Sequence, residues 1–115
     1  MYALRNKVQL IGNLGQAPEI KTFESGRKQA RFSVATTEKY RNARGEKVEE
    51  THWHRVVVWG KLAEVAEKYL TKGKEIAIEG KLVNRTYSDK EGNKKYISEI
   101  VGNDFVMLGS KQRSE

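Results

Sequence analysis

Residues 51–59 carry two kinds of side chain in alternation. Because residues two apart share a face of a β-strand, this segment has an aromatic and cationic face and an opposite face of histidine and aliphatic residues. The first face consists of Trp53, Arg55, Val57 and Trp59. The second face consists of His52, His54, Val56 and Val58. A hydrophobic core requires only the aliphatic side, so the aromatic and cationic side is a candidate binding surface.

Residues 75–87 repeat this division. The apolar face carries Ile76, Ile78 and Leu82, and the opposite face carries Lys81, Val83, Arg85 and Tyr87. Indole and phenol rings stack on nucleic-acid bases, while guanidinium and ammonium groups contact phosphates. Since a duplex hides the faces of its bases and a single strand exposes them, the pattern predicts a single-stranded partner.

Two charged segments extend the predicted surface. Tyr40 lies in a basic run within residues 39–50, which we expect to form a long, mobile hairpin loop. Tyr96 follows two lysines beside a hairpin tip expected at residues 88–94. The alternatives are that the basic loops are only solvated and that both tryptophans fill the core. The candidate nucleic-acid-binding residues are Tyr40, Trp53, Arg55, Trp59, Lys81, Arg85, Tyr87, Lys94, Lys95 and Tyr96.

The elements that must position these residues are mostly strands. Strands are expected at residues 6–14, 27–38, 51–59 and 75–87, with a short returning strand at residues 19–23. Residues 95–101 and 105–108 complete the β structure, with a bend expected at Gly102 and Asn103. Apolar residues at helical spacing predict one helix after Gly60, and these are Leu62, Val65, Ala66, Tyr69 and Leu70. We interpret the order as three strands, one helix and two strands. This order predicts an all-β protein with one helix, a five-stranded OB-fold barrel with the helix between strands 3 and 4. An unrelated α+β sandwich is the alternative.

Length and composition limit the remaining possibilities. The 115 residues fit one domain, expected at residues 1–109, with a short disordered C-terminus at residues 110–115. The absence of cysteine excludes disulfides and thiolate metal sites, and it suits a reducing cytoplasm. Lysine and arginine number 22 against 15 acidic residues, and the net charge of +7 favours an anionic partner. No segment has the character of a signal peptide or a membrane span, so we expect an intracellular protein with no membrane partner.

Three blocks of sequence together resemble the bacterial single-stranded DNA-binding proteins of the SSB family. They read NKVQLIGNLGQAPE, RFSVATTE and THWHRVVVWGKLAEVAEKYLTKGKEIAIEGKL, and the resemblance covers residues 6–108. It implies an OB-fold assembled as a homotetramer with DNA wrapped around its outside. It further implies a cytoplasmic, nucleoid-associated protein that binds and protects single-stranded DNA without strong sequence preference during DNA replication, recombination and repair.

The same resemblance assigns roles to particular residues. The family's stacking positions fall on Tyr40, Trp53, Trp59 and Tyr87, two of them tyrosine where tryptophan is common in the family. The implied oligomer interface includes Lys7, Val8, Leu10 and His54.

The C-terminus departs from the family pattern. Family members usually continue into a Gly/Gln/Pro-rich linker with an acidic tip that recruits replication and repair enzymes. This sequence ends at Lys111, Gln112, Arg113, Ser114 and Glu115, which puts that recruitment in doubt. Either the tail is missing from this sequence, or the chain is a short paralogue, a mobile-element copy or a tail-less relative.

Two other functional classes compete with this interpretation. His52 and His54 share a strand face and could hold a metal ion with Glu49 or Glu50, as in a nuclease, but no third ligand has fixed spacing. Because no GxxxxGK[ST], GxSxG or HExxH motif occurs, we predict no enzyme activity, no metal and no cofactor. The second alternative is an RNA-binding or translation-associated OB module, or a primosome component, since sequence-blind stacking alone does not separate DNA from RNA.

Overall fold

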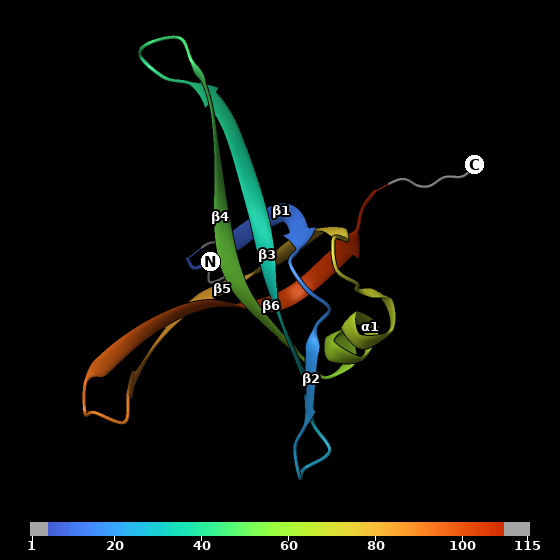
Figure 1. The fold of residues 1–115 in the computed structure, drawn as a ribbon. Helices are drawn as coiled ribbons and strands as arrows, with labels where there is room; N and C mark the ends of the chain where they lie inside the picture. The colour runs from blue at the N-terminus through green and yellow to red at the C-terminus, as the bar shows by residue number, and fades with distance from the viewer. Residues whose placement is uncertain (1–4, 110–115) are drawn as a thin grey trace.

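The computed structural model describes residues 5–109, which form six strands and one helix (Figure 1). The expected disordered segment at residues 110–115 lies outside the described residues. The elements are β1 (Val8–Leu14), β2 (Glu19–Thr22), β3 (Lys28–Arg41), β4 (Lys47–Trp59), α1 (Lys61–Tyr69), β5 (Glu75–Ser88) and β6 (Lys94–Met107).

The strands close into a barrel. Their order is β1-β5-β6-β4-β3-β2, and β1 also pairs with β3, which joins the two sides of the sheet. The end of β1 lies opposite Ala35 and Val34 of β3, and β2 continues along the same strand from Arg31 to Lys28. Because β1 and β2 occupy one position in succession, the barrel has five positions. This arrangement is the OB-fold, as predicted.

The predicted place of the helix needs a correction. We placed it between strands 3 and 4, but α1 lies between β4 and β5. The reason is that Glu19–Thr22 forms a strand of its own, β2, held by backbone pairing with β3. The helix begins after Gly60, whose φ of 63° favours glycine, and its Ala63 and Ala66 are buried against the barrel.

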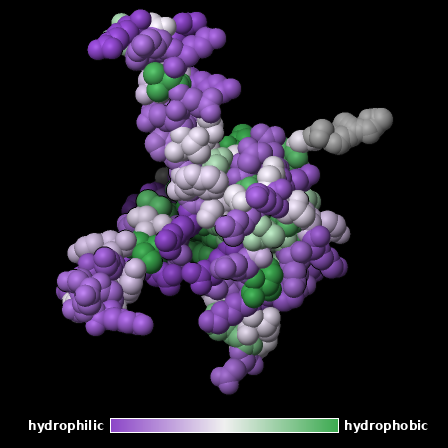
Figure 2. All heavy atoms as spheres, in the orientation of Figure 1, coloured by the Kyte–Doolittle hydropathy of each residue, from purple (hydrophilic) through white to green (hydrophobic). Residues whose placement is uncertain are grey.

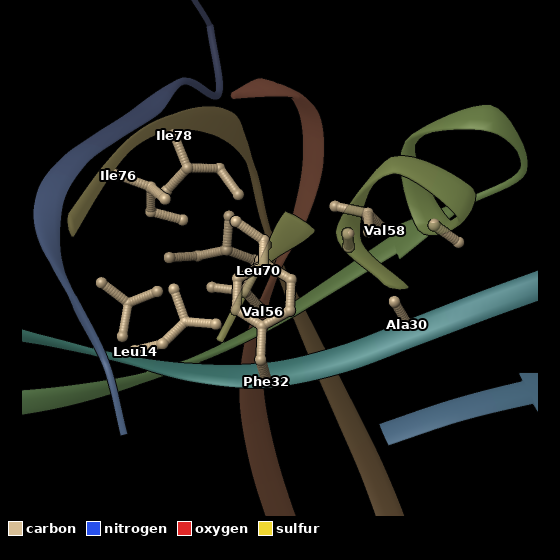
Figure 3. Close-up of a cluster of buried hydrophobic side chains, with 12 residues drawn as sticks. Leu14, Ala30, Phe32, Val56, Val58, Leu70, Ile76 and Ile78 are labelled. Atoms are coloured by element: carbon tan, nitrogen blue, oxygen red, sulfur yellow. The ribbon is translucent and has the colours of Figure 1, made fainter. Parts of the chain in front are cut away.

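The core consists of the inward faces of the strands and the buried side of α1. Every member is aliphatic or aromatic, as the alternation predicted, and fully burying one such side chain contributes about 1.5–3 kcal/mol. Leu82 is the exception among the residues assigned to the apolar face, with 42% of its surface exposed. Figure 3 shows the cluster, which contains Leu14, Ala30, Phe32, Val34, Val56, Val58, Ala63, Ala66, Leu70, Ile76, Ile78 and Ile100.

A bulge bends β6 at Gly102 and Asn103, where the sequence predicted a bend. Glu79 lies opposite Asp104, but the next residue, Gly80, lies opposite Gly102, so Asn103 is left without a partner. A Cβ on Gly80 would stand 2.2 Å from the carbonyl oxygen of Val101, so only glycine permits this close approach. Residues 95–101 and 105–108 therefore belong to one continuous strand that is bent as predicted.

Two long hairpins project from the barrel, and one of them overturns a prediction. Residues 39–50 are not a mobile loop, because β3 and β4 stay paired as far as Arg41 and Lys47. The turn is closed by the Asn42 side chain, whose Oδ1 accepts hydrogen bonds from the backbone N–H groups of Arg44 and Glu46 at 2.9 and 3.0 Å. The β5–β6 hairpin closes in the same way around Asp89.

The error has a physical reason. Beyond residue 38 both faces of the β3–β4 hairpin meet solvent, so no apolar alternation marks the strands, although backbone pairing continues. Figures 1 and 2 show both hairpins extending as arms with hydrophilic tips.

Across residues 5–109 the structure contains no helix long and apolar enough to span a membrane.

Candidate nucleic-acid interface

The register brings the two predicted faces together on the outside of the barrel. Val57 of β4 lies opposite Val101 of β6, and Val101 lies opposite Lys81 of β5. Because parity is kept across these pairs, the Trp53 face of β4 and the Arg85 face of β5 belong to one continuous outer sheet surface. This outer face is the candidate interface. Sequence alternation indicated each strand's face, but only strand pairing shows that the faces adjoin.

Trp53 stands in the open on this outer face. It is 62% exposed and, with Arg55, borders a groove of about 400 Å³ between the sheet and the β1–β2 connection. An added Cβ on Gly15 would lie 2.5 Å from Cζ3 of the Trp53 indole, so the ring rests directly on this glycine. The opposite side of the ring remains available for stacking.

The groove holds charges of both signs. Arg31 of β3 lines it together with Arg55, and Glu19 and Glu99 line it as well. Arg31 was not among the predicted site residues. In the sequence Arg31 alternates with Ala30 and Phe32, which are buried, and this alternation places Arg31 on the outer face. That Arg31 lies near Arg55 follows only from the β3–β4 register.

Trp59 lies on the same face of β4 but in a different setting. It is half-buried, and its ring centroid is 5.5 Å from that of Phe23. The guanidinium carbon of Arg27 stands 4.3 Å from the Trp59 ring centroid, and Lys21 Nζ is 4.8 Å from the centre of the Phe23 ring. One tryptophan is therefore open, while the other is already flanked by a ring and a cation.

The cations of the β5–β6 hairpin also differ from one another. Arg85 is 61% exposed but forms an ion pair with Glu99 at 2.9 Å, and the Glu99 side chain is only 12% exposed. The predicted residues Lys81, Lys94 and Lys95 are exposed. Arg85 is thus partly neutralised before any ligand arrives.

The predicted tyrosines are divided between the two faces of the sheet. Tyr87 shares the face of Arg85 and is 48% exposed. Tyr96 pairs with Thr86, which places it on the opposite face of the hairpin, and it is 77% exposed. Tyr96 lines a second groove of about 300 Å³, and Trp53 and Arg55 line this groove as well.

Tyr40 is separate from both grooves. It lies opposite Val48, on the other face of the β3–β4 ribbon from Trp53, near the tip of the arm. A hydrogen bond to Glu50, with some burial, raises the pKa of the Tyr40 hydroxyl. The Tyr40 hydroxyl is thus engaged with a carboxylate of β4.

The residues implied as an oligomer interface lie at the start of β1 and on the side of β4 that faces away from Trp53. Nε2 of His54 lies 2.9 Å from the Thr36 hydroxyl, and partial burial, followed by the charge of His52, lowers the pKa of His54. Val8 and Leu10 pack against the core, and Lys7 contacts Glu79 at 3.5 Å.

A row of apolar side chains that was not predicted lies on the outer side of β1, β5 and β6. Ile11 lies opposite Ala77, which lies opposite Val106. Ile11 and Val106 are 55% and 58% exposed. The sequence does show an apolar residue in each of these strands at a position where the alternation calls for a polar one.

The two histidines do not assemble a metal site with the nearby acids. His52 Nε2 is 3.6 Å from Glu38 Oε1, while the partner of His54 is a threonine. Within residues 5–109 no three His, Cys, Asp or Glu side chains gather in a metal-binding arrangement.

Comparison with known proteins gives concordant matches. The model of the single-strand binding protein family matches residues 5–108. Single-stranded DNA-binding protein 1 of Chlorobaculum tepidum is 48% identical over 107 residues, which cover 92% of this chain and 66% of that protein. Single-stranded DNA-binding protein 1 of Xylella fastidiosa is 48% identical over 108 residues, covering 93% of this chain and 79% of that protein.

A solved structure is also similar. The structure described as Plasmodium falciparum SSB complex with ssDNA superposes with a TM-score of 0.85 at 35% identity. The superposition covers 90% of this chain and 95% of that one. The chain spans just under two thirds of the Chlorobaculum relative, so that relative has further sequence outside the match.

Proposed function

Since the chain belongs to the single-strand binding protein family, we propose that it binds and protects single-stranded DNA without strong sequence preference. The observation that carries this proposal is the exposed Trp53 indole beside Arg55 at the edge of an open groove. A base stacks on the ring, and the neighbouring guanidinium groups contact the phosphates on either side. Stacking of this kind is generally worth about 1–3 kcal/mol per base and is tolerant of sequence.

The proposed binding track follows the outer face and reaches both arms, where Tyr40 and Tyr96 extend it from the opposite face of each hairpin. Trp53 and Arg55 form its centre, and the remaining members lie along β4 and the two hairpins. A single strand of DNA that crosses these elements does not contact the aliphatic side of the barrel, because the β-strands bury that side in the core. The full set is Tyr40, Trp53, Arg55, Trp59, Lys81, Arg85, Tyr87, Lys94, Lys95 and Tyr96.

We further propose the biological setting from family membership. The protein acts without catalysis during DNA replication, recombination and repair, in the bacterial cytoplasm at the nucleoid. It assembles as a homotetramer through surfaces that include Lys7, Val8, Leu10 and His54. Light scattering checks the assembly, since a monomer at micromolar concentration would contradict it.

Fluorescence titration tests the binding itself. Adding poly(dT) should quench the emission of the two tryptophans, because stacked bases quench indoles, whereas a duplex oligonucleotide should leave the emission nearly unchanged. Matched deoxy- and ribo-oligonucleotides should be compared at the same salt concentration, since salt alone changes such affinities by orders of magnitude. Unchanged emission at a saturating concentration of poly(dT) would exclude stacking on Trp53.

A further inference from the structure

The turn between β2 and β3 carries an aromatic and cationic cluster that the sequence pattern did not indicate. Phe23 directly follows β2, and its ring contacts Trp59 at a centroid distance of 5.5 Å with the two planes tilted by 36°. Arg27, at the other end of the turn, lies over Trp59, and Lys21 lies over Phe23. We call Lys21, Phe23, Arg27 and Trp59 the turn cluster.

The turn itself is well defined. The backbone N–H of Phe23 donates to the carbonyl of Arg27 at 2.8 Å, and the N–H of Gly26 donates to the carbonyl of Phe23 at 2.8 Å. Gly26 has a φ of 88°, which favours glycine. Phe23 remains 36% exposed despite its contact with Trp59. The ring is therefore held by the backbone while part of it meets solvent.

The cluster continues the proposed binding track. Trp59 is six residues from Trp53 on the same face of β4, a separation of about 20 Å at the usual strand rise. Arg55 and Val57 lie between them on that face, and Val57 is opposite Arg31 of β3. In Figure 1 the turn lies below β2, at the opposite end of the β3–β4 hairpin from the tip of its arm.

The two cations of the cluster are not neutralised by acids. Within residues 5–109 no carboxylate forms an ion pair with Lys21 or Arg27, in contrast to the Arg85–Glu99 pair and the Lys28–Glu67 pair. Their partners are rings alone. A cation over an exposed ring gains only about a two- to fivefold factor in an equilibrium constant, whereas base stacking gains about 5- to 150-fold. A base that displaces Lys21 from Phe23 therefore gains more than it loses.

We propose that the turn cluster is a second contact site for single-stranded DNA, in which a base stacks on Phe23 while Lys21 and Arg27 contact the flanking phosphates. Trp59 backs the Phe23 ring and positions Arg27. This inference rests on the proposed function, because it adds a site to the same track. The ligand is the same single strand after it leaves the Trp53 groove.

Binding of oligothymidylates of two lengths tests the proposal. Single OB-folds cover about 4–16 nucleotides, so a 16-mer is taken to span both sites and a 5-mer to occupy the Trp53 groove alone. Phe23→Ala should weaken binding of the 16-mer by at least about fivefold and leave the 5-mer within twofold. Phe23→Leu, which keeps an apolar side chain against Trp59 but lacks a π-face, should show the same loss with an unchanged melting temperature. Tyr69→Ala, which removes a 56% exposed ring on α1, is the control and should leave both affinities unchanged.

Salt dependence tests the role of the cations. Arg27→Ala should make the plot of log K against log salt concentration shallower by about 0.7 for each lost phosphate contact, and Lys68→Ala on α1 should leave it unchanged. If Arg27→Ala instead tightens binding, Arg27 is a competitor for the Trp59 ring and the proposal is wrong. If Phe23→Leu binds the 16-mer as the unaltered protein does, the second site is excluded while the proposed function stands. If the unaltered protein binds neither oligonucleotide, the proposed function itself fails.

Discussion

The two ends of the outer face of β4 carry the same residue type in opposite conditions. Trp53 is 62% exposed and rests on the backbone at Gly15. Trp59 is half-buried between elements, with Phe23 and Arg27 against its ring. Both follow the same alternation on the same strand, so the difference comes from what the β1–β2 connection and the β2–β3 turn place beside them. An exposed indole is free to bind, whereas a packed indole also supports the fold.

Alanine substitution of each tryptophan gives the largest expected contrast. Trp53→Ala should weaken poly(dT) binding by about 1–3 kcal/mol and leave the melting temperature nearly unchanged. Trp59→Ala should lower the free energy of unfolding, because it removes the ring contact with Phe23, a type of contact worth about 0.5–1.5 kcal/mol beyond area burial. Binding titrations and thermal melts of both variants measure the contrast. Equal loss of stability in the two variants would contradict it.

A substitution beneath the exposed ring should sharpen the comparison. In Gly15→Ala the new Cβ would lie 2.5 Å from the Trp53 ring, so the ring must move. We expect binding to weaken by about 1 kcal/mol, the lower end of the stacking range, with little change in stability because the ring is free to shift into solvent. Isothermal titration calorimetry with an oligothymidylate measures the loss.

The control for this prediction is a double-mutant cycle. In the Trp53→Ala background, Gly15→Ala should have no further effect on affinity, because the ring that it displaces is absent. An undiminished loss in that background would mean that Gly15 acts through the backbone and not through the indole.

The cations of the track should differ as the tryptophans do. Arg55 forms no ion pair with an acid among the residues that the structure describes, whereas Arg85 is held by Glu99 at 2.9 Å. Arg55→Ala should therefore reduce the salt slope of binding by about 0.7, and Arg85→Ala should reduce it less. Glu99→Gln should raise affinity modestly by releasing Arg85. Titrations at several salt concentrations measure all three slopes, and equal slopes for the two arginine variants would contradict the prediction.

The smallest expected effect concerns the other face of β4. Partial burial lowers the pKa of His54 below the ordinary value of 6.5, so the unfolded chain takes up this proton before the folded protein does. The contribution of His54 to stability is thus present above about pH 6.5 and is lost as the pH falls through the lowered pKa. Urea unfolding at a series of pH values should show a decline that is weaker in His54→Gln. Identical pH profiles for the two proteins would rule out this role of His54.

Much of the barrel was predictable from local patterns. Alternation identified the inward residues of β3, β4 and β5, for example Phe32, Val56 and Ile78, because a strand with one buried face must repeat every second residue. Helical spacing located α1 for the same reason. Where both faces meet solvent the pattern disappears, and the prediction for residues 39–50 was wrong there.

The site was predictable only in part. The outward position of Trp53 and Arg55 followed from alternation on β4, and the family resemblance pointed to the same residues. Arg31 and Phe23 were missed as site residues, because neither stands near Trp53 or Trp59 in the sequence.

The amino-acid sequence by itself determined which side chains of each strand face the core and which face outward, since that depends only on parity along one segment. Only the tertiary structure decided that Trp53 stays open, that Arg27 covers Trp59 and that Glu99 holds Arg85. These contacts join residues from different elements of the fold, and their distances depend on barrel closure and register. Parity within one strand contains no information about either.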